Sequence, residues 1–215
     1  MTEVLQTISC EQCKTISCRQ GYPEGMPDWC QGQLYHDTID QAKPKYLQPQ
    51  ELSIHVAAAK VIKMGYNQWT RLQETIEFAR ELRVKKLGIA TCVGLLDEAR
   101  EMVRYFKRGG LNDLVVVGCM MGGIGDRETG IPEEYGYRYH TTCNPITQAE
   151  VLNREGTDLN VMVGLCIGHD TLFLKYSKAP VTVFAVKDRV TCNNPTAVLF
   201  SPFHRMRLNE AYKKT

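Results

Sequence analysis

Short apolar runs alternate with helical patterns along most of the chain, and this alternation constrains the fold more than any other feature. Beyond Arg83 we expect four strands with three helices between them. The expected strands are 86–91, 114–118, 160–165 and 181–186, and the expected helices are about 95–107, 145–155 and 170–177. Such alternation is typical of a mostly parallel sheet flanked by helices on both faces. The sequence therefore predicts an α/β fold.

The first 48 residues differ in character from the rest of the chain. From Pro49, apolar residues at helical spacing predict a helix that ends near Gly65, and Thr70 with Gln73 forms a capping box for a second helix. Residues 1–48 show neither helical nor strand periodicity and lack the apolar content for a core. We therefore expect a small Cys-rich segment at 1–48 and an α/β domain at 49–215.

The nine cysteines indicate metal or redox chemistry. The N-terminus has no leader pattern and no run is long enough to span a membrane, so we expect a cytoplasmic protein, in which disulfides are uncommon. The net charge of +2 comes from scattered residues, which favours neither nucleic acid nor an anionic membrane as a partner. Two sets of four cysteines are expected, with Cys192 left over.

The first set consists of Cys10, Cys13, Cys18 and Cys30, in the pattern C-x2-C-x4-C-x11-C. Four thiolates from adjacent loops form a tetrahedral metal site, and the metal supplies folding energy that a segment without a core lacks. Free structural thiols are the alternative, but these cysteines lie among polar residues rather than among Leu, Ile and Val. Zinc and an iron–sulfur cluster both accept four cysteines, and the spacing fits either.

The second set consists of Cys92, Cys119, Cys143 and Cys166. Three of them follow expected strands and Cys143 precedes an expected helix that has Asn144 as N-cap and Pro145 at its first position. The carboxyl ends of parallel strands meet at one edge of the sheet, so we expect the four thiols to converge there and to bind a shared metal or cluster. An iron–sulfur cluster fits this set better than structural zinc; the alternative is four unrelated buried cysteines.

Charged and ionisable residues accompany these cysteines. We expect His169 to lie in the loop after Cys166 and to face the same crevice, with Asp170 as the N-cap of the next helix. Lys187 and Arg189 follow the last expected strand, where they either contact a substrate or belong to a solvated loop. We assign His169, Lys187 and Arg189 as candidate catalytic residues.

Three other features of the sequence are not assigned to the site. For one of them, the Tyr-rich segment, two roles stay open. The glycines of 122–125 lack the spacing of a phosphate-binding loop. The residues Tyr135, Tyr137, Tyr139 and His140 belong to a long segment before Cys143 that forms either a lid or a packed surface loop. His55 lies between Ile54 and Val56 in an expected helix and is assigned a structural role.

Several motifs together resemble the DUF1847 family, cysteine-rich proteins of anaerobic bacteria and archaea often labelled metal-binding. The resemblance spans nearly the whole chain and rests on the N-terminal cysteine group, IATC at 89–92, CNPITQAEVLN at 143–153, NVMVGLCIGHD at 160–170 and KYSKAPVTVFAVKDR at 175–189. It implies metal binding and assigns no reaction.

Three functions remain open from the sequence. The first is an iron–sulfur enzyme or electron-transfer protein that acts on a small molecule or a redox partner. The second is a non-catalytic metal sensor or carrier. The third, a thiol–disulfide oxidoreductase, is less favoured because the single CxxC pair lies outside the βα units. The sequence does not specify an oligomeric state.

Overall fold

The computed structural model describes residues 10–21, 25–136 and 140–213 of the 215-residue chain. Contacts divide the chain into two compact units, residues 1–59 and 60–215. The division falls within helix α3 (Pro49–Gly65), whereas the composition of the sequence changes at residue 48. No helix in the described ranges is long and apolar enough to cross a membrane.

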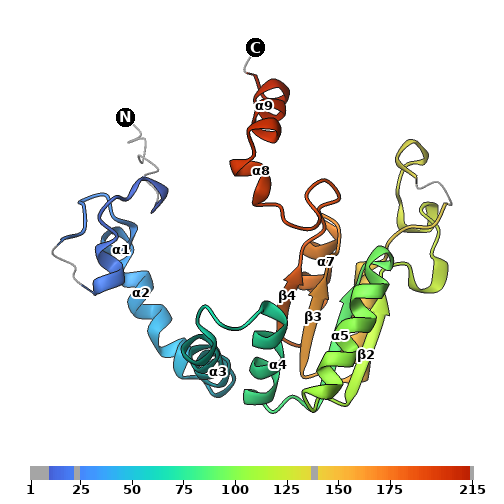
Figure 1. The fold of residues 1–215 in the computed structure, drawn as a ribbon, viewed down its shortest axis with the longest axis horizontal. Coiled ribbons are helices and arrows are strands. Elements are labelled where there is room, and N and C mark those ends of the chain that lie inside the picture. Colours follow the sequence, from blue (N-terminus) through green and yellow to red (C-terminus); the bar gives the residue numbers. More distant parts are fainter. Residues whose placement is uncertain (1–9, 22–24, 137–139, 214–215) are drawn as a thin grey trace. The chain divides into compact units, whose positions relative to one another are not determined.

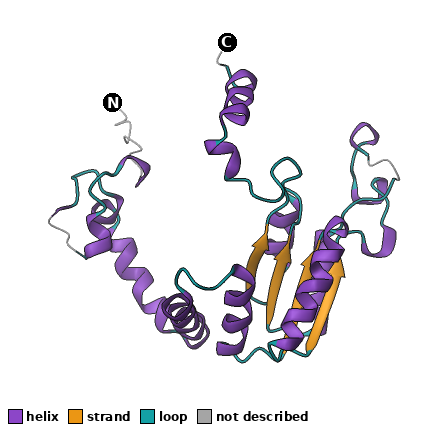
Figure 2. Cartoon of the chain, in the orientation of Figure 1, coloured by secondary structure: helices purple, strands orange, loops and turns teal. Residues whose placement is uncertain are grey.

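The second unit contains a parallel sheet of four strands (Figure 1). The strands are β1 (Lys86–Thr91), β2 (Asp113–Gly118), β3 (Leu159–Val163) and β4 (Val181–Ala185), in the spatial order β2-β1-β3-β4. Every neighbouring pair is parallel, so all strands point the same way, as the arrows in Figure 2 show. The predicted α/β fold with a parallel sheet is confirmed.

Helices flank this sheet. They are α4 (Arg71–Glu81), α5 (Leu96–Arg108), α6 (Pro145–Glu155) and α7 (His169–Tyr176). Helix α5 packs on β1 and β2 and lies in front of the sheet in Figure 1, whereas α7 lies behind it and packs against α6. The chain ends with α8 (Ala197–Phe200) and α9 (Pro202–Ala211).

The core of the second unit lies between the sheet and its helices. All five residues of β3 and five of the six in β1 are buried, as expected for central strands of a parallel sheet. Phe106 of α5 and Phe173 of α7 are fully buried against them. The local signals hold well, since Thr70 accepts a capping hydrogen bond from the Gln73 N–H, and Gly156 ends α6 with a φ of 66°.

The first unit is built from short elements without comparable burial. It contains 3₁₀ turns at Cys10–Gln12, Ser17–Gln20 and Lys43–Leu47, and the helices α1 (Gln31–Leu34) and α2 (His36–Ala42), before α3 begins. Within the described part of residues 10–50, no residue is fully buried. Packing energy alone therefore contributes little to the order of this segment.

Candidate thiol site at the carboxyl edge of the sheet

The strand order has a switch point, with β1 and β3 as the neighbouring central strands of the sheet. The chain runs from β1 to β2 on one side and then crosses to β3 on the other side of β1. In such sheets ligands bind where the order reverses, outside the carboxyl ends of the strands. Cys92 directly follows β1 and Cys119 directly follows β2, so both cysteines lie at this edge.

Three of the predicted thiols form a connected chain of sulfur atoms. The Sγ atoms of Cys119 and Cys143 lie 3.4 Å apart, which is hydrogen-bonding distance for two thiols. The Cys92 side chain forms a hydrogen bond with Cys119 as well. Cys92 and Cys119 are buried and Cys143 is half-buried. The tertiary structure thus brings together side chains from three separate connections.

Backbone amides of the turn after β1 support two of these sulfurs. The Val93 N–H donates to Cys119 Sγ at 3.3 Å, and the Gly94 N–H donates to Cys92 Sγ at 3.4 Å. Hydrogen bonds to sulfur favour the thiolate, which is the form that binds metal. The turn therefore places the partial positive charge of two amide N–H groups against the sulfurs of Cys92 and Cys119.

Cys143 is held in place through its neighbour Asn144. The Asn144 N–H donates to the Cys119 carbonyl at 2.7 Å, and its side-chain amide donates to the Met121 carbonyl. Asn144 occupies the expected N-cap position of α6 but makes no side-chain capping hydrogen bond. Its side chain instead joins α6 to the loop after β2, which places the Cys143 thiol against Cys119.

The fourth thiol, Cys166, lies in the loop after β3 and has a charged partner. The Arg189 guanidinium donates to Cys166 Sγ at 3.2 Å. Arg189 and Cys166 both act electrostatically on Cys143, so they belong to the same neighbourhood as its sulfur. Lys187 acts on Cys92 in the same way. The loop after β4 therefore brings two cations to the thiols.

The connected thiols have opposite pKa shifts. The hydrogen bond with Cys119, reinforced by burial, raises the pKa of Cys92 far above its usual value of 9.0. By contrast, the hydrogen bond with Cys119 lowers the pKa of Cys143. Because the three thiols are hydrogen-bonded to one another, their titrations are coupled, and the loss of the first proton is a property of the three thiols together. Cys143 is the one whose pKa is lowered.

The segment after β3 differs from the prediction in two respects. The strand ends at Val163 rather than at residue 165, because Gly164 adopts a φ of 62° that interrupts the extended backbone. Helix α7 begins at His169, so the prediction that Asp170 is the N-cap was wrong, and Gly168 with a φ of 80° takes that position. His169 Nδ1 is buried and has no hydrogen-bond partner among the described residues.

One important residue, Gln148, was not found by sequence reasoning. It lies on α6 and is fully buried. Its side-chain amide donates to the Thr91 carbonyl at 3.2 Å and to the Val117 carbonyl at 2.7 Å. Gln148 therefore connects the ends of β1 and β2 to the helix that follows Cys143. The sequence signal for this role was the position of Gln148 in the expected helix 145–155, next to Ala149 on its apolar face.

We expect Gln148→Met to lower the free energy of unfolding by about 2 kcal/mol, because two buried hydrogen bonds are lost with little change in volume. Urea denaturation measures this change. Glu150→Gln, an exposed substitution on the same helix, is the matched control and should have almost no effect. Equal stability of the two variants would contradict a connecting role for Gln148.

The N-terminal cysteines make contacts mostly with other groups. Cys10 and Cys13 share one turn, in which the Cys13 N–H donates to the Cys10 carbonyl at 3.1 Å. Cys10 Sγ donates to Gln31 Oε1, and Cys30 is the residue before α1. In the described ranges no three Cys, His, Asp or Glu side chains stand in the geometry of a metal site. Metal ligation by Cys10, Cys13, Cys18 and Cys30 stays a prediction.

We expect Cys13 to react with iodoacetamide roughly tenfold faster than Cys92 near neutral pH, because the thiolate is the reactive form. Hydrogen bonds with Thr15 and the Ile16 amide lower the pKa of Cys13, whereas the hydrogen bond with Cys119 and burial raise the pKa of Cys92. Mass spectrometry of reduced, metal-free protein gives both rates. In urea the two rates should converge, and a difference that persists there would contradict the structural explanation.

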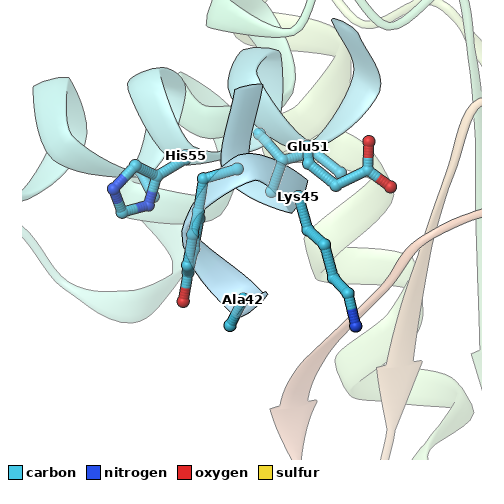
Figure 3. Close-up of a pocket in the computed structure, with 7 residues that line it drawn as sticks. Ala42, Lys45, Glu51 and His55 are labelled. Atoms are coloured by element: carbon cyan, nitrogen blue, oxygen red, sulfur yellow. The ribbon is translucent and has the colours of Figure 1, made fainter. Parts of the chain in front are cut away.

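Two further features lie outside the thiol site. Between Cys119 and Cys143 the chain forms short 3₁₀ turns, including Glu133–Tyr135, and a single bridge between Gly125 and Thr141, but Tyr137 and Tyr139 lie outside the described residues. A hollow in the first unit is lined by Ala42, Lys45, Tyr46, Glu51, Ile54, His55 and Ala58 (Figure 3). His55 packs its ring against Tyr46 there, with centroids 5.1 Å apart.

The fold and the site define an α/β protein with a cysteine-lined carboxyl edge. A family model described as protein of unknown function (DUF1847) matches residues 30–184, and the chain belongs to this family. The chain is also 36% identical over 203 residues to an uncharacterized protein of Methanocaldococcus jannaschii. The aligned region covers 94% of this chain and 99% of the relative. No solved structure matches the chain.

Proposed function

We propose that the protein binds a metal centre, zinc or an iron–sulfur cluster, through Cys92, Cys119, Cys143 and Cys166, for redox or small-molecule chemistry. The observation that carries this proposal is the chain of three sulfurs, with Cys119 and Cys143 only 3.4 Å apart. In a tetrahedral site with bonds of about 2.3 Å, neighbouring sulfurs are about 3.8 Å apart. A small outward movement of the thiols would therefore admit a metal.

The surroundings of the sulfurs support the same proposal. The Val93 and Gly94 amides already donate to two of them. A cluster held by four thiolates carries net negative charge, which the adjacent Lys187 and Arg189 would offset. The same two cations could also bind an anionic substrate. An iron–sulfur cluster would supply one-electron transfer, while the chain's own residues would position the substrate and exclude water.

A non-catalytic metal sensor or carrier is the alternative proposal. It is favoured by the partial exposure of Cys143 and Cys166, which would let a metal exchange with solvent. Anaerobic purification with metal and acid-labile sulfide analysis distinguishes the two. A brown protein with labile sulfide supports a redox centre, whereas a colourless protein with zinc alone supports a sensor or structural role. Absence of both metals after reconstitution would contradict the proposal.

We expect His169→Ala to change metal retention or redox potential by a measurable amount while leaving the melting temperature of the metal-free protein nearly unchanged. The reason is that Nδ1 makes no hydrogen bond among the described residues, so its loss removes no intrachain partner. His169→Gln tests whether a polar group restores retention. The expectation fails if His169→Ala unfolds more readily but keeps the metal content and spectra of the unmodified protein.

A further inference from the structure

Cys119 and Cys143 are placed for a reaction with each other. Their sulfurs lie 3.4 Å apart, and the hydrogen bond from the Asn144 N–H to the Cys119 carbonyl holds their backbones together. A disulfide bond of about 2.05 Å needs the sulfurs to approach by only about 1.4 Å, which side-chain rotation can provide. We propose that Cys119 and Cys143 form a redox-active pair that a low-molecular-weight disulfide oxidises to an intrachain disulfide.

The burial of the two residues sets the order of the steps. Cys119 is only 2% exposed, whereas Cys143 is half-buried. The Cys143 thiolate therefore attacks one sulfur of the incoming disulfide, whose S–S bond breaks and whose other half leaves and is protonated to a thiol. A mixed disulfide on Cys143 results. The reagent reaches Cys143 first because Cys119 is covered.

The second step closes the pair. Cys119 loses its proton to solvent and attacks the Cys143 sulfur, which breaks the mixed disulfide and releases the second half of the reagent as a thiol. Two cysteines have then lost two electrons and two protons, and the reagent has gained both as two thiols. Cys92, which also forms a hydrogen bond with Cys119, is not a member of the proposed pair.

Oxidation of this pair would compete with metal binding, and that consequence rests on the proposed function. A disulfide uses two of the four thiolates proposed as ligands, so the oxidised protein would no longer hold the metal. The pairing itself does not need the metal. It follows from the tertiary contact between residues that are 24 positions apart.

The test uses full-length, metal-free protein treated with oxidised glutathione, followed by alkylation of remaining thiols and trypsin digestion. Trypsin cleaves after Arg127, between the two cysteines, so a disulfide appears as two linked peptides. We expect the Cys119–Cys143 linkage to be the main intrachain disulfide. Cys119→Ser should accumulate glutathione on Cys143 roughly tenfold above the unmodified protein, because no second thiol resolves it. The control Cys192→Ser should retain the linkage.

Failure to find the linked peptides while the two thiols are modified separately would overturn the proposal, as would another cysteine pair forming faster. Cys119→Ala gives a second test if the serine variant does not fold. Detection of the linked peptides in the unmodified protein does not depend on any variant. Metal affinity is measured separately on reduced protein. If the disulfide forms but the reduced protein binds no metal, only the proposed function is contradicted. If the protein binds metal but the disulfide does not form, only the proposal of a redox pair is contradicted.

Discussion

Replacing Cys119 with Ser is expected to lower metal affinity by more than about a hundredfold, a larger loss than removal of a supporting residue causes. Cys119 is the middle member of the sulfur chain, since it contacts Cys143 at 3.4 Å and forms a hydrogen bond with Cys92. Without the Cys119 thiol, the sulfurs of Cys92 and Cys143 lose the group that joins them. Competition with a chromogenic chelator measures the affinity of the reconstituted protein.

Cys192→Ser is the matched control for this measurement. Cys192 is exposed, lies in the segment after β4 and is outside both predicted sets of ligands. We expect its substitution to leave affinity unchanged. If Cys119→Ser retains the affinity of the unmodified protein while Cys13→Ser abolishes binding, the metal belongs to the N-terminal set and the strand-end proposal is wrong.

Replacing Gly164 with Ala is expected to lower the free energy of unfolding by about 3 kcal/mol, through two separate effects. The first is the left-handed backbone, since Gly164 has a φ of 62°. The second is crowding, because a Cβ at this position would overlap the Cδ1 atom of the buried Leu95. Thermal and urea denaturation of the metal-free protein measure the total loss.

Gly156→Ala separates the two effects. Gly156 has a similar φ of 66°, but a Cβ there would meet no other atom within 4 Å. It should therefore cost only about 1 kcal/mol, the cost of the backbone conformation alone. In a Leu95→Ala background, which lacks the crowding atom, Gly164→Ala should cost less than it does in the unmodified protein. Equal losses for the two glycine variants would show that Leu95 moves aside and that crowding is absent.

Local patterns in the sequence predicted the elements of the α/β unit well. The expected strand at 86–91 and the expected helix at 145–155 coincide with β1 and α6. These elements carry their signals within a few residues, such as a short apolar run, Pro145 at the first helical position and Gly156 after the last turn. The errors after β3 occurred where Gly164 and Gly168 take positive φ angles, which periodicity does not reveal.

The sequence also predicted which cysteines approach the carboxyl edge, because every parallel strand ends there. It did not determine which thiols touch. The contact between Cys119 and Cys143, the link from Gln148 to the ends of β1 and β2, and the Arg189–Cys166 pair all join segments distant in the chain. Local periodicity encodes the elements, whereas these contacts depend on the strand order β2-β1-β3-β4 and on packing, which only the tertiary structure decides.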